Sequence, residues 1–146
     1  MTLWRFVATF FYLGKLPIAP GTWGSLGALI VWLFLPITIS VHLSVILILF
    51  IFGVYSSHRV AKYLNVHDPS EVVIDEAVGM GISLFILPHN LDLYLLAFIL
   101  FRLFDILKPS FIYQLQNLPS GWGIMLDDVI AGLFTLAIVS GFATIS

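Results

Sequence analysis

Two pairs of adjacent carboxylates stand directly before apolar segments of this sequence. Asp75 and Glu76 form the first pair, and Asp127 and Asp128 form the second. Either pair alone could be a helix cap, because acidic residues are favoured in the first turn of a helix. Two pairs beside strongly apolar segments are harder to explain as caps, because ionisable groups near lipid are costly and usually functional. We therefore interpret both pairs as parts of one site.

A third charged group lies at the end of another apolar segment. Arg102, Asp105 and Lys108 recur every three residues before Pro109, which marks the expected helix end. This spacing places the three side chains within one 120° arc of a helix. They could form an intrahelical salt-bridge ladder with snorkelling stems. They could also form an anion site beside a metal ligand, because Arg and Lys are the cations that bind phosphate.

The ligand types in these groups indicate a hard cation. The five carboxylates are Asp75, Glu76, Asp105, Asp127 and Asp128, and the chain has no cysteine. Oxygen ligands without thiolates or paired histidines suit Mg²⁺ better than zinc or copper. The four histidines stand apart in the sequence, and we do not expect them to be ligands or catalysts. Without cysteine, disulfides and a Cys nucleophile are excluded.

Two Gly- and Pro-bearing stretches are predicted to be loops. The stretch 14–25 precedes the first long apolar segment, and Lys15, Thr22 and Ser25 could bind a phosphate there together with backbone N–H groups. It could equally be an ordinary turn, and it lacks the Gly-Lys-Ser/Thr ending of a P-loop. The stretch 118–125 leads into Asp127, and its Trp122 suits an anchor at the level of lipid headgroups.

The composition explains what must position these groups. The chain has 146 residues, of which 60% are hydrophobic and 10% charged, whereas about 25% are charged in soluble domains. A protein of this size could not bury so many apolar side chains, so the excess must face lipid. A net charge of −2 with six Lys and Arg excludes extensive nucleic-acid binding. We expect one integral-membrane domain over residues 1–146.

The expected fold is all-α and polytopic. An N-terminal helix rich in aromatic residues, within 3–12, is predicted to lie at the membrane interface. About five membrane-embedded helices follow, because the apolar runs lack the alternation of strands and only helices or closed barrels satisfy backbone groups in lipid. The predicted embedded segments are 26–39, 42–57, 77–87, 91–107 and 129–145.

The charges also predict an orientation. Threading five helices in alternation places all six basic residues on one side, which is the cytoplasmic side by the positive-inside rule. Seven of the eight acidic residues fall on that side as well, and only Asp92 falls on the other. The N-terminus is therefore expected inside and the C-terminus outside, with the carboxylates and cations meeting at the cytoplasmic face.

Taken together, these motifs resemble the phosphatidylglycerophosphatase A family of bacterial lipid phosphatases. The matching stretches occur in order over most of the chain, at 14–26, 73–79, 101–109 and 121–132. The resemblance implies Mg²⁺-dependent hydrolysis of the terminal phosphomonoester of phosphatidylglycerophosphate, giving phosphatidylglycerol and phosphate in phospholipid biosynthesis. It also implies a bacterial cytoplasmic membrane protein whose lipid substrate presents its phosphate at the headgroup level.

For this chemistry we expect some of the five carboxylates to hold one or two Mg²⁺ ions. Arg102 and Lys108 would stabilise charge on the phosphoryl group, while the metal would lower the pKa of an attacking water. Glu76 or Asp128 could be the base, and a covalent aspartyl intermediate is an alternative to direct attack by water. The sequence does not fix the number of metals or the oligomeric state.

Two other functions are alternatives to the phosphatase. A divalent-cation transporter would need polar groups near the middle of the membrane, where the sequence offers mainly Ser44, Ser83 and Thr135. A non-enzymatic membrane scaffold would explain the small residues of the helices, but not the convergence of carboxylates. The pattern of a phosphatidyltransferase is absent from the sequence.

Overall fold

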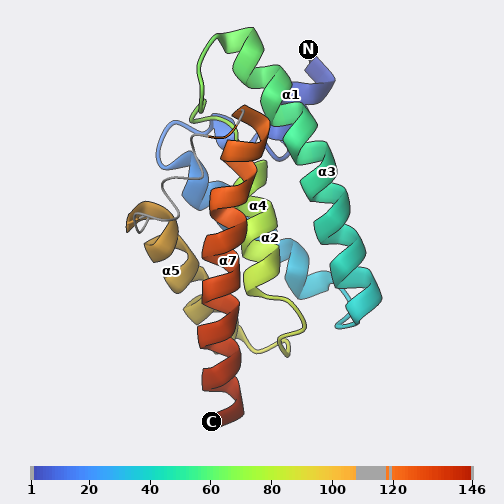
Figure 1. Ribbon diagram of the computed structural model, residues 1–146. Coiled ribbons are helices and arrows are strands. Elements are labelled where there is room, and N and C mark those ends of the chain that lie inside the picture. Colours follow the sequence, from blue (N-terminus) through green and yellow to red (C-terminus); the bar gives the residue numbers. More distant parts are fainter. Residues whose placement is uncertain (1, 108–117, 119, 146) are drawn as a thin grey trace.

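The computed structural model describes residues 2–107, 118 and 120–145, and these residues form helices and connecting segments without any strand. The predicted all-α class is therefore confirmed. Figure 1 shows the arrangement of the helices. They are α1 (Thr2–Ala8), the 3₁₀ helix η1 (Leu13–Lys15), α2 (Pro20–Phe34), α3 (Ile39–Leu64), α4 (Ile74–Ser83), α5 (Leu91–Leu107) and α7 (Ser120–Ile145).

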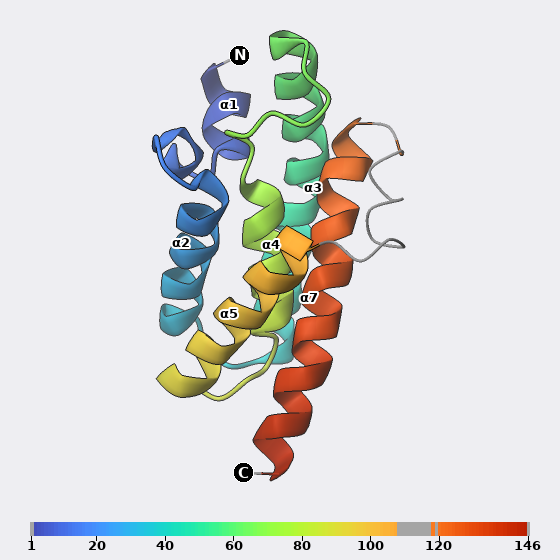
Figure 2. The ribbon, with the colours of Figure 1, turned by 90° about the vertical axis from the view of Figure 1, so that its left-hand side faces the viewer.

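The short helix α4 lies at the centre of the bundle. It packs against α2, α3, α5 and α7, and nine of its ten residues are buried. Figure 2 shows α4 enclosed between α2, α5 and α7, with α3 behind it. A helix that is apolar nearly all round is stable only where neighbours cover every face. The central position of α4 thus follows from its composition and fixes the place of the two acidic residues in its first turn.

Glycines bring α4 and α7 into close contact. A Cβ atom built on Gly132 would lie 2.5 Å from the carbonyl oxygen of Gly79, and one built on Gly79 would lie 2.8 Å from the carbonyl oxygen of Asp128. Real Cβ atoms do not approach backbone this closely, so only glycine fits at either position. This contact sets the distance between the helices that carry the two pairs of adjacent carboxylates.

We expect Gly132→Ala to destabilise the protein by about 1–3 kcal/mol, because its new methyl group must push α7 away from the backbone of α4. Gly141→Ala is the matched control, since it lies on the same helix and its Cβ would meet nothing within 4 Å. Thermal unfolding in detergent should show a lower Tm for Gly132→Ala only. Equal Tm values for both variants would show that the contact is not tight.

Local signals place several helix ends. Pro20 begins α2, where its missing N–H costs nothing. The side chain of Thr38 accepts a hydrogen bond of 3.3 Å from the backbone N–H of Val41 and so caps α3. Asn90 does the same for α5, because its Oδ1 accepts a 2.9 Å bond from the N–H of Asp92. These signals set the N-terminal ends of the three helices.

The structure corrects the number of expected membrane-embedded helices. Among the described residues, two stretches are long and apolar enough to cross a membrane, Ile39–Leu64 and Gly121–Ile145, instead of five. The helices α2, α4 and α5 have 15, 10 and 17 residues, whereas a bilayer core of about 30 Å needs about 20. Their apolar composition reflects burial against neighbouring helices as well as exposed apolar faces.

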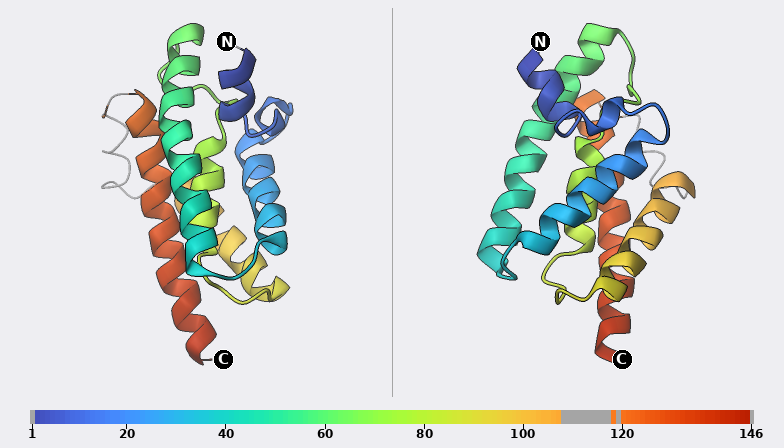
Figure 3. Two further views of the ribbon diagram at one scale, coloured as in Figure 1. Left: turned by 90° about the vertical axis from the view of Figure 1, so that its right-hand side faces the viewer. Right: turned by 180° about the vertical axis from the view of Figure 1, so that it is seen from behind.

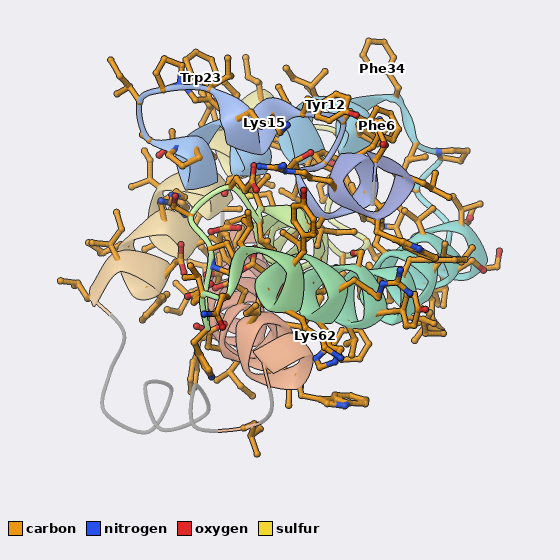
Figure 4. The ribbon with its side chains drawn as sticks, turned by 90° about the horizontal axis from the view of Figure 1, so that it is seen from above. Phe6, Tyr12, Lys15, Trp23, Phe34 and Lys62 are labelled. Atoms are coloured by element: carbon orange, nitrogen blue, oxygen red, sulfur yellow. The ribbon has the colours of Figure 1, made fainter. Side chains whose placement is uncertain are left out.

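The two long helices expose most of their apolar residues. Only 22% and 28% of their most apolar 18-residue stretches are buried. Figure 4 shows Phe34 and Trp23 of α2 also pointing outward, away from the bundle. A soluble domain of this size would be expected to hide such side chains from water. The apolar surface and the two long helices together suggest an association with a membrane.

Both predicted loops are partly helical. The helix α2 begins at Pro20, within the expected loop 14–25, and α7 begins at Ser120, well before the expected start at residue 129. In α7 tertiary packing overrides the low helix propensity of glycine, since a Cβ on Gly121 would lie 2.4 Å from the carbonyl oxygen of Val54 in α3. The glycines permit close helix contact here instead of making a turn.

Most of the basic segments lie toward one end of the bundle. Arg5 and Lys15 lie in α1 and η1, Arg59 and Lys62 lie in the last turns of α3, and Arg102 lies near the end of α5. The views of Figure 3 show α1, η1 and the last turns of α3 toward the end of the bundle that holds the N-terminus, with the C-terminus at the opposite end, whereas the end of α5 lies nearer the middle. Four of the five described basic residues thus lie toward one end, and the predicted orientation in a membrane stays a prediction.

Candidate active site

Five carboxylates from three helices converge beside Arg102 within the bundle. Asp75 and Glu76 come from the first turn of α4, Asp105 from the last turn of α5, and Asp127 and Asp128 from α7. Their oxygens form two groups, and within each group one oxygen per residue lies within 4.8 Å of the others. The first group is Asp75, Asp127 and Asp128, and the second is Glu76, Asp105 and Asp128. The structure therefore brings together all five predicted metal ligands.

Asp127 and Asp128 do not cap a helix, because they lie inside α7. Because α7 begins at Ser120, Asp127 and Asp128 lie about two turns inside the helix, beyond the first four N–H groups that need a cap. Asp75 differs, since its Oδ1 accepts a 2.9 Å hydrogen bond from the backbone N–H of Glu76. Only the α4 pair thus combines a local role at a helix start with a place in the cluster.

The cluster is shielded from solvent. The exposed fractions are 7% for Asp75, 8% for Asp105, 3% for Asp127 and 1% for Asp128. Two buried oxygens, Oε2 of Glu76 and Oδ2 of Asp128, have no hydrogen-bond partner among the described residues. Buried polar oxygens without partners are costly, and a cation bound beside these two would satisfy both.

Among the described residues, Arg102 is the cation that pairs with this cluster. Its Nη1 donates to Oδ2 of Asp105, one turn further along α5, and lies 4.0 Å from Oε1 of Glu76 on α4. Its Nε has no hydrogen-bond partner among the described residues. One guanidinium therefore links two of the three helices, and it cannot balance five carboxylates by itself.

Burial shifts the proton equilibria of the α4 pair. Burial raises the pKa of Asp75 well above its usual value, and the neighbouring carboxylates, with Glu76 first, raise it further. Burial likewise raises the pKa of Glu76 to about 7, although the hydrogen bond with Asp75 and the charge of Arg102 oppose the shift. A cation bound here would favour the ionised forms, so its binding would release protons.

The start of α2 forms one wall of the site. A Cβ on Gly21 would lie 2.9 Å from Oε1 of Glu76, 3.0 Å from Nη1 of Arg102 and 3.1 Å from Nη2 of the same residue. The α2 backbone therefore lies against the Glu76–Arg102 pair with no room for a side chain. From the sequence, Gly21 is predicted to lie in a loop that could offer backbone N–H groups to a phosphate, and its contact with this pair was not predicted; the Pro20-Gly21 step at a helix start was the available signal.

Gly21→Ala is expected to lower the rate of the reaction at this site about 10- to 100-fold, since a displacement near 1 Å in an active site can cost that much. The methyl group would meet the ends of two side chains and not backbone, so Tm should change little. Steady-state kinetics and thermal unfolding of the same sample measure both effects. Activity equal to that of Gly141→Ala would show that this contact does not position the pair.

The remaining predicted phosphate-binding residues lie in different settings. Ser25 is buried, and its hydroxyl donates a 2.8 Å hydrogen bond to the carbonyl oxygen of Gly21. Its hydroxyl is therefore bonded to the α2 backbone that forms the wall of the site. Thr22 lies half-buried in the first turn of α2. Lys108 lies outside the described residues.

Lys15 lies beside a separate polar cavity. Its Nζ lies 5.1 Å from the centre of the Tyr12 ring, next to which Figure 4 labels it. The cavity has a volume of about 620 Å³ and is also lined by Arg5 and Glu71, whose side chains pair at 2.9 Å. This ion pair between α1 and the segment before α4 was not predicted from the sequence.

The donor set fits a hard divalent cation. Within the described residues every candidate ligand is a carboxylate, and Mg²⁺ prefers oxygen ligands of this kind. The unpartnered oxygens of Glu76 and Asp128 offer free lone pairs. Beside them, Arg102 provides a planar donor that matches a phosphate group. The arrangement can bind a cation and a phosphate side by side within an apolar bundle.

Comparison with known proteins identifies one matching family and relatives that bear its name. The profile of the family described as Phosphatidylglycerophosphatase A matches residues 6–143. A protein of Escherichia coli named "Phosphatidylglycerophosphatase A" is 39% identical over 141 residues, which are 93% of this chain and 81% of the relative. The protein of the same name from Haemophilus influenzae is 39% identical over 130 residues, or 86% and 80% of the two chains.

A third relative carries a different name. A Bacteroides thetaiotaomicron protein named "Putative phosphatidylinositol-3-phosphatase" is 38% identical over 143 residues, which are 92% of this chain and 89% of the relative. No solved structure matches the chain. The relatives are thus named for phosphatases of phospholipid monoesters, and their names differ in the lipid headgroup.

Proposed function

Because the chain belongs to the phosphatidylglycerophosphatase A family and is a phosphatase enzyme, we propose that it hydrolyses the terminal phosphomonoester of phosphatidylglycerophosphate with the help of Mg²⁺. The products would be phosphatidylglycerol and inorganic phosphate, and the reaction would serve phospholipid biosynthesis. The observation that carries the proposal is the convergence of five carboxylates and Arg102 within an apolar bundle.

The proposed role of Arg102 is to bind the phosphoryl group. Its Nη1 is engaged by Asp105, whereas its Nε has no hydrogen-bond partner among the described residues. A guanidinium can donate two parallel hydrogen bonds to phosphate oxygens. Arg102 would therefore orient the group and stabilise the charge that spreads over its oxygens during transfer. Lys108 is proposed to assist from the end of the same segment.

The five carboxylates are proposed to hold the cation. A divalent cation bound there would offset the charge of the phosphate oxygens and lower the pKa of a water molecule. Glu76 or Asp128 would accept the proton of the attacking water, because each has a buried oxygen without a hydrogen-bond partner. The water oxygen forms a bond to phosphorus as the phosphorus–oxygen bond to the lipid breaks, and the leaving alkoxide takes up the proton that the base accepted and becomes the glycerol hydroxyl.

The apolar surface of the bundle supports a position in the membrane. We propose that the protein spans the bacterial cytoplasmic membrane several times, with the basic end of the bundle on the cytoplasmic side. The substrate would keep its acyl chains in the bilayer and present its phosphate at that end. The exposed apolar residues of the two long helices, which include Ile51, Phe52 and Phe142, would face the acyl chains.

A substrate comparison tests this proposal. Purified protein in detergent would be given phosphatidylglycerophosphate, phosphatidic acid or phosphatidylinositol 3-phosphate, each with Mg²⁺, and released phosphate would be measured. We expect the fastest release from phosphatidylglycerophosphate. Faster release from phosphatidylinositol 3-phosphate would instead favour the activity for which the Bacteroides relative is named, and release from none of the three would contradict the proposal.

A further inference from the structure

We infer that the site holds two divalent cations and that Asp128 is the ligand shared by both. This inference rests on the proposed function, because it concerns the same carboxylates, but it adds the number of cations and a distinct role for one residue. It follows from the arrangement of the oxygens, from the burial of Asp128 and from the charge of the site.

The oxygens form two groups with one common member. Asp75, Asp127 and Asp128 make the first group, and Glu76, Asp105 and Asp128 make the second. The other two members of each group belong to that group alone. Each group offers three carboxylates within 4.8 Å, which is enough protein ligation for a cation that keeps some of its water. A carboxylate has two oxygens, so Asp128 can serve one cation with each. In that case Glu76 is the base of the two residues proposed above.

Asp128 is the most deeply buried of the five acidic residues. It is 1% exposed, and its Oδ2 has no hydrogen-bond partner among the described residues. The backbone at Asp128 is fixed by the contact with Gly79 of α4. The residue is therefore held rigidly between α4 and α7, with an unsatisfied buried oxygen that a cation would satisfy.

The charge of the site also favours two cations over one. Among the described residues, the five carboxylates and Arg102 have a formal charge of −4 when all are ionised, which two divalent cations would cancel. A single cation would leave two buried negative charges without a partner, and unpaired buried charges are strongly destabilising. The second group lies beside Arg102, which contacts two of its members.

Manganese binding without substrate tests the inference separately from catalysis. The full-length protein in detergent would be stripped with EDTA, desalted and titrated with Mn²⁺, while electron paramagnetic resonance counts bound ions and detects magnetic coupling. We expect two Mn²⁺ per chain and the coupled spectrum of two ions that share a carboxylate. One ion per chain, or two ions without coupling, would overturn the inference.

Three variants assign the ligands. Asp75→Asn and Glu76→Gln each remove a carboxylate of one group only, so each should keep one Mn²⁺ and lose the coupling. Asp128→Asn should weaken both sites at least about 10-fold, the size of effect that even supporting residues have on metal affinity. Asp92→Asn is the control, because Asp92 is exposed at the start of α5. Unchanged binding by Asp128→Asn would overturn the shared role.

The outcomes separate the inference from the proposed function. Two coupled Mn²⁺ ions in a protein that releases no phosphate would support the shared ligand and contradict the phosphatidylglycerophosphatase assignment. Phosphate release from phosphatidylglycerophosphate by a protein that binds a single ion would support the phosphatidylglycerophosphatase assignment and contradict the shared ligand. Gel filtration and Tm of each variant show whether it is folded, and a loss of coupling in folded Asp75→Asn or Glu76→Gln supports the inference even if Asp128→Asn does not fold.

Discussion

Asp128→Asn is expected to lower the rate of phosphate release from phosphatidylglycerophosphate about 10³-fold or more. The substitution keeps the size of the side chain but removes a negative charge from both groups of carboxylates. A bound cation contributes several kcal/mol to the stabilisation of the transition state, and each 1.36 kcal/mol corresponds to a factor of ten. The measurement is kcat with saturating Mg²⁺ and lipid.

The stability of the same variant distinguishes catalysis from folding. In EDTA, Asp128→Asn should unfold at the same temperature as the unmodified protein or higher, because it relieves repulsion among buried carboxylates. Mg²⁺ should raise the Tm of the unmodified protein more than that of the variant, since ligands stabilise the state that binds them. A fully active Asp128→Asn protein would remove the carboxylate cluster from the mechanism.

Arg102→Ala is expected to lower kcat by about 10³-fold, the lower end of the effect of arginines that stabilise phosphoryl transfer. Arg102→Lys should recover only part of this loss, because Lys keeps the charge but lacks the planar fork. The variant also leaves Asp105 and Glu76 without their cation. Kinetics over a range of lipid concentrations would show whether kcat or KM carries the loss.

Arg59→Ala is the matched control for this prediction. Arg59 is also an arginine of the bundle, but it is exposed, and its Nη1 donates a 2.9 Å hydrogen bond to the hydroxyl of Tyr55 in its own helix. Its removal should leave kcat within about twofold, since exposed pairs contribute little. Equal losses in both variants would indicate a general effect of positive charge and not a site at Arg102.

The convergence of the carboxylates could be predicted from sequence because paired acidic residues beside apolar helices are rare and costly. Asp75, Glu76, Asp127 and Asp128 carry that signal themselves, and the spacing of Arg102 and Asp105 gives their ion pair directly. Hydropathy also gave the helical class and the collection of most of the described basic residues toward one end. These features depend on residue type and on helix periodicity, both of which the sequence contains.

The helix lengths and the wall of the site could not be predicted in the same way. Apolar composition does not distinguish a buried central helix such as α4 from one that crosses a membrane. Likewise, glycines that permit close packing look like turn residues, which is why the starts of α2 and α7 were placed too late. The contact of Gly21 with the Glu76–Arg102 pair depends on tertiary structure alone.

Restoration of activity by a cation is the most direct test of a carboxylate-held phosphatase centre. Purified protein would be treated with EDTA, shown to be folded, and given phosphatidylglycerophosphate before and after Mg²⁺ is added back in excess. We predict negligible phosphate release before the addition and full release after it, with no recovery in Asp128→Asn. Full release in EDTA, or equal recovery in the variant, would contradict the role assigned to the cluster.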